Sequence, residues 1–477
     1  MKQLLPILFF CAFTSTASAQ EVISAEPQAQ TLALALNFVL PINVQYNVNN
    51  FKITYTTTDA FGQPDTATGL LSYPDASGMV LPLVVYNHGT IASDDLAPSN
   101  EGVLERLLIA GFAGRGYVAL APDYLGQSGD DGLHPYLHAD TEASAGRDMV
   151  IAAKKWLVTQ DIEQNEQLFV TGYSQGGHAS AALHRNVETA PGDDELTITA
   201  AAHLSAPFNV MAPSPLLLGL ADVDTRLLAF FLNTAISYNF VYNLYGGLDG
   251  LIKEPYLTQA QRFVDEEIDL YRMGDVIDSL RRDRNELIGG IFSDAFVTDV
   301  LDNDAELVNA YESNEVYDWA PQSPTLIYYC NADMTVSPTN SILADSVMRM
   351  NGATDILLVD GGALNHGDCA IPAALRTLAF FEELANRFPV SLGAPVTRPE
   401  LTLVPNPVAA GATVRLEGLP QAAHTYVVYD FSGRALLTGQ TEMDGTLTLP
   451  FSLSGGVKVL RVGMANGTSV VRRFVVK

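Results

Sequence analysis

Between Leu81 and Pro207 the chain alternates apolar runs of strand length with amphipathic stretches of helix length. The strand-like runs include LPLVVYNHG, YVALAPDY, QLFVTGYS and ITAAAHLSAP. Strands that alternate with helices are typical of a parallel sheet with crossover helices. The sequence therefore predicts an α/β fold, with a mostly parallel sheet and helices on both faces.

From Phe208 to Ala320 the pattern becomes helical alone, and strand-like runs return only in PTLIYYCNAD and DILLVDGG. A long helical insertion between two strands is most simply a cap over the carboxyl edge of the sheet, where ligands bind in open α/β sheets. We expect a catalytic domain over residues 20–388, with residues 208–320 as its helical cap.

The first residues, MKQLLPILFFCAFTSTASAQ, combine Lys2, a short apolar run and the small residues Ala17-Ser18-Ala19. This layout is typical of a cleavable signal peptide, whose apolar core is too short to span a bilayer. We expect residues 1–19 to be removed; the alternative is a buried first helix. No later run has the length and apolarity of a transmembrane segment.

The formal charge of the 477-residue chain is -28. From Arg398 to the end, Lys and Arg outnumber Asp and Glu by 8 to 5, so the acidic excess lies in the preceding residues. A strongly acidic domain disfavours nucleic acid and anionic membranes as partners. We therefore expect no nucleic-acid partner.

A second composition shift occurs at residues 389–400, where PVSLGAPVTRPE indicates a linker. Short alternating runs separated by turn residues follow, among them ATVRLEG, TYVVYDFSG and GVKVLRVGM. This spacing predicts a small all-β sandwich over residues 401–477. A carbohydrate-binding or adhesive sandwich is one interpretation of such a tail.

The tail also resembles a known family through LVPNP at 403–407, VYDFSGR at 428–434, the run 457–462 and RFVVK at 473–477. These residues are similar to the C-terminal sorting domain of the type IX secretion system of Gram-negative bacteria, although Lys458 stands where such domains usually carry tyrosine. The resemblance implies that the type IX machinery is a partner. It also implies a product that is secreted or attached to the cell surface.

The stretch FVTGYSQGGHASAAL contains the pattern G-x-S-x-G around Ser174. The pattern alone is weak evidence, but here it follows an apolar strand and precedes small residues that let a helix pack closely. That setting is typical of a nucleophile elbow, in which glycines on both sides relieve crowding around a strained, exposed serine. The alternative is a structural glycine-rich turn.

A nucleophilic serine needs a base, and the base needs an orienting carboxylate. Chain order in this class is serine, acid, histidine, with the last two in loops after the final strands. Asp333 follows the strand-like run LIYYC, and His366 follows DILLVD. We predict these two residues as acid and base; Asp360 and Asp368 are alternatives for the acid.

An oxyanion hole needs two backbone N–H groups aimed at the developing negative charge. One is expected from Gln175, directly after the nucleophile. The other is expected from Thr90, because Gly89 lets the loop after the run LPLVVYN turn. His134 and His138, four residues apart, could suggest a metal site, but no further ligand set is evident. We expect neither a metal nor a cofactor.

The main domain resembles the α/β-hydrolase fold. Within that fold NHGT, APDYLG, GYSQGG, the helical insertion and the NHGDC loop resemble the secretory lipase family and its bacterial esterase relatives, over about residues 40–385. The resemblance implies carboxylic-ester hydrolysis through an acyl-enzyme, without a cofactor, under a cap that shapes the acyl pocket.

Cys330 lies three residues before Asp333, and Cys369 lies three residues after His366. If the acid contacts the base, the two loops are adjacent and the cysteines come within reach of a disulfide, as an oxidising compartment favours. The alternative is two buried free thiols.

The combined prediction is a secreted serine esterase or lipase that acts on a small-molecule, lipid or polymer ester. Apolar cap residues favour an apolar acyl group or, equally, form the core of the cap: Leu227, Phe230, Phe231 and Tyr238. Two alternatives stay open. One is a serine peptidase of the prolyl-oligopeptidase type, and the other is a non-catalytic surface adhesin on a hydrolase scaffold.

Overall fold

The computed structural model describes residues 20–76, 78–127, 132–190, 192, 196–210, 215–389, 402–417, 422–429, 435–450, 452–463 and 469–477. The expected signal peptide, and the expected linker from residue 390 onward, lie outside these ranges. The chain divides into two compact units. The first runs to Thr377 and includes Leu384–Pro389, and the second consists of Leu378–Glu383 and Val390–Lys477.

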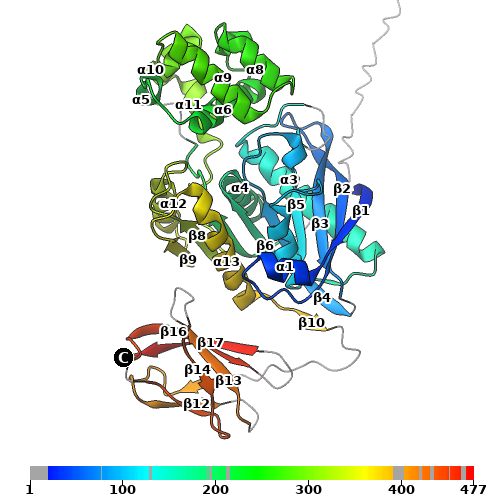
Figure 1. Cartoon of the computed structure of the whole chain (residues 1–477), viewed down its shortest axis with the longest axis vertical. Helices are drawn as coiled ribbons and strands as arrows, with labels where there is room; N and C mark the ends of the chain where they lie inside the picture. Colours follow the sequence, from blue (N-terminus) through cyan, green and yellow to red (C-terminus); the bar gives the residue numbers. More distant parts are fainter. Residues whose placement is uncertain are drawn as a thin grey trace, which may run out of the picture. The chain divides into compact units, whose positions relative to one another are not determined.

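The first unit is built around one large twisted sheet, whose strands follow the order β1-β2-β3-β5-β4-β6-β7-β8-β9 (Figure 1). The strands from β5 to β9 in this order run parallel. They are β5 (Val118–Pro122), β4 (Met79–Asn87), β6 (Gln164–Tyr173), β7 (Ile198–Leu204), β8 (Thr325–Tyr329) and β9 (Ile356–Asp360). The predicted mostly parallel sheet is confirmed.

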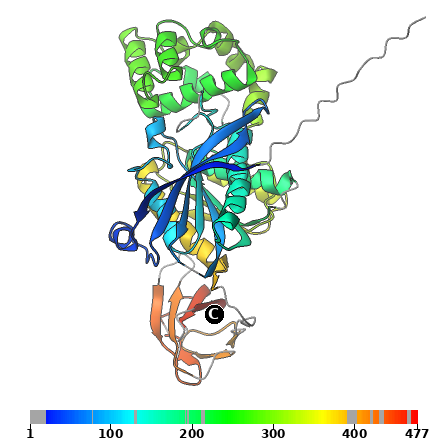
Figure 2. The same ribbon diagram turned by 90° about the vertical axis from the view of Figure 1, so that its right-hand side faces the viewer.

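Helices flank this sheet on both sides (Figure 2). The strand β5 is buried at every position and β4 at all but its first two, as expected for strands covered on both faces. Helices α3 and α4 lie side by side. The helices around the sheet are α1 (Ala33–Val39), α2 (Arg106–Gly114), α3 (Ala139–Thr159), α4 (Gln175–Thr189), α12 (Pro338–Met350) and α13 (His366–Leu384), with the 3-10 turn η1 (Asp94–Leu96).

Antiparallel strands extend the parallel sheet on the side of β5. The alternation of strands and helices in the sequence did not predict them. They are β1 (Val22–Thr31), β2 (Val48–Thr58) and β3 (Pro64–Pro74), while the short β10 (Phe388–Pro389) pairs with β4. Hairpin strands need no crossover helix, so this part of the chain lacks the periodicity that identified the rest. They belong to the same sheet and form no separate amino-terminal domain.

The helical insertion forms a cap beyond the carboxyl ends of the parallel strands (Figure 1). Its apolar side chains form a cluster of their own, which also takes in Tyr136 and Leu137 from the loop before α3. The cap elements are α5 (Pro215–Leu218), α6 (Thr225–Tyr242), α7 (Leu248–Leu251), α8 (Tyr256–Val264), α9 (Leu270–Asp283), η2 (Ile288–Ile291), α10 (Asp294–Asp302) and α11 (Ala305–Glu312).

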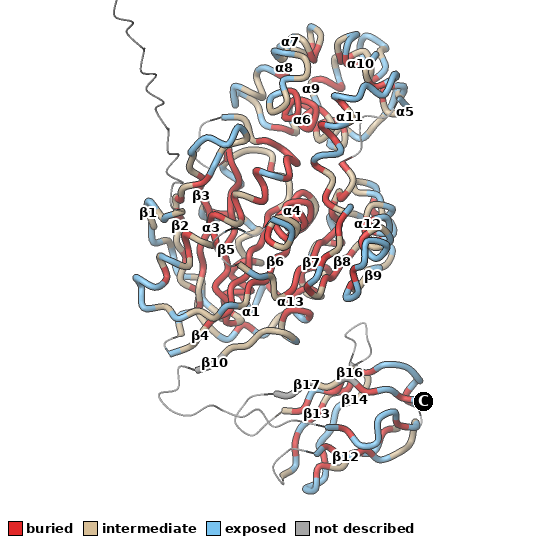
Figure 3. Tube along the Cα trace, turned by 180° about the vertical axis from the view of Figure 1, so that it is seen from behind, coloured by how far each residue is buried: buried red, intermediate tan, exposed pale blue. Residues whose placement is uncertain are grey.

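Buried residues follow the strands of the sheet and helix α4, whereas much of α12 is exposed (Figure 3). Because strand ends and the first turn of α4 adjoin this packed core, side chains that leave them are held by rigid elements. Among the described residues, no helix is long and apolar enough to cross a membrane.

The second unit contains two small antiparallel sheets. One has the order β11-β12-β15 and the other β14-β13-β16-β17, and side chains from both sheets share one apolar core. Lys458 is buried in this unit, and its Nζ donates to the Gly455 carbonyl at 3.3 Å. The strands are β11 (Thr402–Val404), β12 (Thr413–Glu417), β13 (Thr425–Tyr429), β14 (Ala435–Gln440), β15 (Thr446–Thr448), β16 (Gly456–Gly463) and β17 (Ser469–Val476).

Candidate active site

Ser174 occupies the sharp corner between strand β6 and helix α4, with φ 60° and ψ -121°. This backbone conformation is strained for a residue with a side chain. The flanking glycines make the corner possible: a Cβ at Gly176 would lie 2.0 Å from the Asn87 carbonyl oxygen, and one at Gly172 would lie 2.1 Å from the Gly176 carbonyl oxygen. The predicted strand–turn–helix setting of Ser174 is therefore present.

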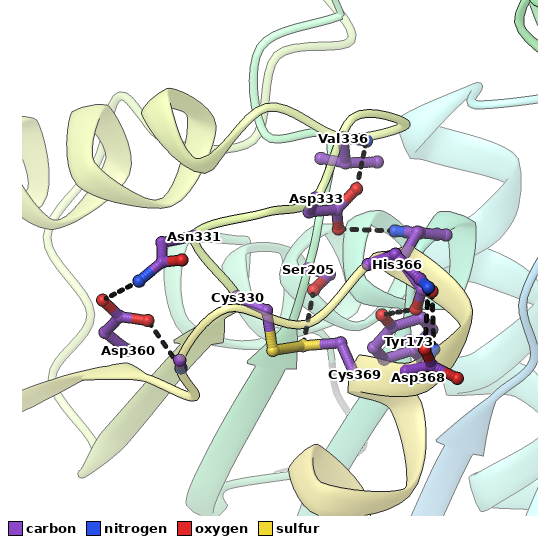
Figure 4. The surroundings of a disulfide bond; sticks show 12 residues. Tyr173, Ser205, Cys330, Asn331, Asp333, Val336, Asp360, His366, Asp368 and Cys369 are labelled. Atoms are coloured by element: carbon purple, nitrogen blue, oxygen red, sulfur yellow. Dashed lines mark hydrogen bonds and ion pairs between the residues drawn. A yellow bond between two sulfur atoms is a disulfide. The ribbon is translucent and has the colours of Figure 1, made fainter.

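The side chains of Asp333 and His366 line up with this serine. His366 Nε2 lies 2.8 Å from Ser174 Oγ, and His366 Nδ1 lies 2.6 Å from Asp333 Oδ2. Asp333 is buried, and its Oδ1 accepts hydrogen bonds from the backbone N–H groups of Thr335 and Val336, each at 2.9 Å. These donors fix the carboxylate so that its second oxygen faces the imidazole (Figure 4).

The two alternative acids have other partners. Asp360 accepts from Asn331 Nδ2 at 3.1 Å and from the Gly362 N–H at 2.8 Å. Asp368 accepts from Asn365 Nδ2 at 2.7 Å on the exposed start of α13. Neither carboxylate is hydrogen-bonded to His366 in the part of the chain that the structure describes.

A disulfide joins Cys330 to Cys369, with their Cα atoms 6.1 Å apart. The first cysteine follows strand β8 directly, and the second lies in the first turn of α13 (Figure 4). The bond therefore connects the loop that carries Asp333 to the helix that begins with His366. Both cysteines are fully buried.

Tyr173, the residue before the serine, makes a further contact with the histidine. Its hydroxyl donates to the backbone carbonyl of His366, and its ring lies 5.1 Å from the imidazole between centroids. Burial raises the pKa of Tyr173, so its hydroxyl keeps the proton that it donates. Sequence reasoning missed this contact, because nothing local indicates where the tyrosine hydroxyl points.

The loop after β4 packs directly against the corner, since a Cβ on Gly89 would lie 3.3 Å from the Tyr173 carbonyl oxygen and 3.9 Å from Ser174 Cβ. Among the described residues, the backbone N–H groups of Gln175 and Thr90 have no hydrogen-bond acceptor. Two unpaired donors beside a candidate nucleophile are what an oxyanion hole requires.

Side chains hold this loop in place. Glu105 Oε1 accepts from the Gly89 N–H at 3.2 Å and from the Tyr86 hydroxyl at 2.7 Å. Burial, with the neighbouring Glu105 carboxylate, raises the pKa of Tyr86 well above its usual value. Thr90 Oγ1 is 2.8 Å from the Tyr136 hydroxyl. Sequence reasoning did not identify Glu105, whose partners lie sixteen or more residues away.

The cap contacts the same loop. The Leu270 N–H at the start of α9 donates to the Ala92 carbonyl at 3.0 Å. The aromatic cap residues named above pack within the cap: Tyr238 is fully buried, Phe231 contacts Phe292 with centroids 5.3 Å apart, and Phe230 contacts Tyr271. These contacts favour the cap-core interpretation of the three rings.

The histidines considered for a metal are engaged elsewhere. His134 Nδ1 lies 2.9 Å from the Leu125 carbonyl, and His138 Nδ1 lies 3.1 Å from Thr141 Oγ1. Within the described ranges, no three His, Cys, Asp or Glu side chains group as a metal site.

Comparison with known families now places this chain. The model of the secretory lipase family matches residues 99–378, which is more than half of the chain. The chain belongs to the secretory lipase family. It is accordingly a carboxylic ester hydrolase of the lipase and esterase class. A search among curated proteins finds no match.

Solved structures agree in fold. A protein of Legionella pneumophila is 22% identical with a TM-score of 0.67, over 76% of this chain and 98% of that one. The rice cell wall degrading esterase LipA of Xanthomonas oryzae is 25% identical with a TM-score of 0.62, over 74% and 94%. Lipase A of Candida antarctica is 17% identical with a TM-score of 0.60, over 76% and 81%. The predicted α/β-hydrolase fold is confirmed.

Proposed function

We propose that the enzyme hydrolyses esters through an acyl-enzyme on Ser174, with His366 as the base and Asp333 as the orienting acid. The observation that carries this proposal is the continuous row of hydrogen bonds from Asp333 Oδ2 through the imidazole to Ser174 Oγ, at 2.6 and 2.8 Å. Each of the three side chains leaves the end of a different strand, as catalytic groups of this fold do.

In the first half of the reaction, Ser174 Oγ attacks the ester carbonyl carbon while its proton moves to His366 Nε2. The N–H groups of Gln175 and Thr90 stabilise the oxyanion that forms on the carbonyl oxygen. His366 then returns the proton to the leaving alkoxide, so that an alcohol departs and an acyl-serine remains. In the second half, a water molecule attacks the acyl carbonyl while His366 takes its proton. His366 then returns that proton to Ser174 Oγ, and the carboxylic acid is released. Asp333 keeps its charge and stabilises the imidazolium in both halves.

The test is the hydrolysis of p-nitrophenyl esters with two to sixteen acyl carbons by the mature enzyme and by Ser174→Ala. We expect turnover by the enzyme and loss of at least about 1000-fold in the variant, since removal of a triad member abolishes the nucleophilic route. The chain-length optimum separates an esterase from a lipase.

A fluorophosphonate probe, which labels activated serines, is the companion measurement. If the enzyme is labelled at Ser174 but hydrolyses no ester, peptides become the substrates to test and the peptidase alternative gains. If it is neither labelled nor active, the proposal is wrong and the non-catalytic adhesin replaces it.

We further propose the domain boundaries given by the sequence: a signal peptide at 1–19, the catalytic domain at 20–388 with its cap at 208–320, and a type IX sorting domain at 401–477. The two small sheets of the tail and their shared core support a separate β domain. Deletion of 401–477 in a Gram-negative host that has type IX secretion is expected to leave active enzyme in the periplasm. Undiminished export of the deleted chain would contradict the sorting role.

A further inference from the structure

A cluster of polar side chains, most of them buried, contacts the first turn of α4. It centres on Glu142 in the first turn of α3, which is 1% exposed. Glu142 Oε1 accepts from the Gln175 side-chain Nε2 at 3.0 Å, and Glu142 Oε2 lies 2.6 Å from His178 Nδ1. A carboxylate is rarely buried this fully unless it is paired.

We propose that Glu142 is a positioning residue for the oxyanion hole: it holds Gln175, whose backbone N–H is one of the two oxyanion donors. This inference rests on the proposed function. Glu142 touches neither the substrate nor the reacting atoms. It acts by fixing the helix turn on which the donor lies.

The hydrogen-bond pattern permits one arrangement of the Gln175 amide. His134 Nδ1 faces the Leu125 carbonyl, which can only accept, so Nδ1 carries the proton and Nε2 is left as an acceptor. Burial lowers the pKa of His134 to about 4, which keeps this ring neutral near pH 7. Gln175 Nε2 then donates one hydrogen to His134 Nε2 at 2.8 Å and the other to Glu142. The reversed amide would set its oxygen against the carboxylate.

Glu142 holds the same turn at a second point. His178 lies three residues after Gln175, and its Nε2 donates to the Asn314 carbonyl at 2.7 Å. A single proton therefore lies between His178 Nδ1 and the carboxylate, and the fully buried pair is neutral overall. Since Glu142 binds both residues, it fixes the rotation of the turn as well as its position.

The cluster also reaches the cap. Asn314 Oδ1 accepts from the Ala139 N–H at 2.8 Å, and its Nδ2 donates to the Tyr242 hydroxyl of α6 at 2.7 Å. Asn314 thus links the start of α3, the imidazole of His178 and a cap helix. An oxyanion donor must be held to within a fraction of an ångström, and a hydrogen-bonded network of mostly buried side chains supplies that rigidity.

The experiment compares Glu142→Ala, Gln175→Ala, the double variant and Glu142→Gln, with kcat expressed per serine labelled by fluorophosphonate. Both alanine variants are expected to lower kcat by about 10-fold or more with KM within about twofold, because the donor acts on the transition state. The double variant is expected to fall no further than the worse single variant, since both changes remove one interaction.

Glu142→Gln is the conservative variant. Its amide can accept from Gln175 and donate to a neutral His178, so we expect kcat within about threefold of the parent. Asp148→Ala is the matched control: it removes another buried carboxylate of α3, one that accepts from Thr57 Oγ1 at 2.8 Å. This control is expected to lower stability and leave kcat per labelled serine unchanged.

Three results would overturn the inference: Glu142→Ala with an unchanged kcat, losses that multiply in the double variant, or an equal loss in Asp148→Ala. If Glu142→Ala does not fold, Gln175→Ala serves as the test in its place. An unchanged kcat in Gln175→Ala would then overturn the inference. An unlabelled, inactive parent enzyme would overturn the proposed function, and this inference with it.

Discussion

The two halves of the candidate active site are held in place by different means. In the acid–base half, Asp333 lies in the loop after β8 and His366 at the start of α13, and a disulfide joins the two segments. The oxyanion half consists of Gln175 at the start of α4 and Thr90 in the loop after β4, and side chains support it, chiefly the buried Glu142 and the partly buried Glu105.

The difference follows from what each half presents to the substrate. A base works through a side chain at the end of a loop, so its freedom is reduced by tying the loop itself. An oxyanion donor is a backbone N–H, which moves only if the turn moves, so its freedom is reduced by packing and hydrogen bonds around the turn. The activity of the acid–base half should therefore depend on the disulfide. That of the oxyanion half should depend on the side chains packed around its backbone.

The largest expected effect comes from Asp333→Asn. The amide can no longer stabilise the imidazolium and favours the wrong tautomer of His366, so kcat should fall on the order of 1000-fold or more. Steady-state hydrolysis of a p-nitrophenyl ester measures it. Asp368→Asn is the control, because that carboxylate pairs with Asn365 and should leave kcat unchanged. Equal losses in both would remove Asp333 from the acid role.

Removal of the disulfide by Cys330→Ala with Cys369→Ala should have an intermediate effect. The bond spans 39 residues of chain. Its loss is expected to lower the free energy of unfolding by about 2–4 kcal/mol, measured by urea denaturation. We expect kcat to fall by less than about tenfold, because the freed loops hold Asp333 and His366 less firmly. An unchanged denaturation midpoint would show that the link does not stabilise these loops.

The smallest expected effect is on the pH dependence of stability, and it concerns the oxyanion half. The pKa of His134 is lowered from 6.5 to about 4 in the folded enzyme. The unfolded chain therefore binds more protons between these values, and the free energy of unfolding should decrease as the pH falls from about 6.5 to 4.

His134→Gln should flatten that slope by less than about 1 kcal/mol per pH unit, since His134 is only partly buried. Urea denaturation at several pH values measures it. His203 is fully buried and its pKa is also lowered, so part of the slope should remain in the variant. An identical slope in parent and variant would show that His134 is not held neutral.

Much of the fold could be read from the chain because the parallel part of the sheet alternates with helices and its strands are almost uniformly apolar. The antiparallel strands β1–β3 could not, since they pair with one another and with β5 without crossover helices. The candidate triad could be anticipated because Ser174 directly follows a strand, and Asp333 and His366 come shortly after the last two parallel strands, β8 and β9. The runners-up Asp360 and Asp368 had similar sequence settings, and the direction of their side chains separated them from Asp333.

The sequence by itself determined the parallel part of the sheet, the helical insertion, the β tail and the candidate nucleophile, because all of these depend on local periodicity or on a short motif. Only the tertiary structure decided which buried groups support them. Glu142 lies at helical spacing before the buried residues Ala145 and Met149, a charge on an apolar face that signals a buried partner. That partner comes from α4, more than thirty residues away, and hydrogen bonding between distant segments leaves no periodic trace in the chain.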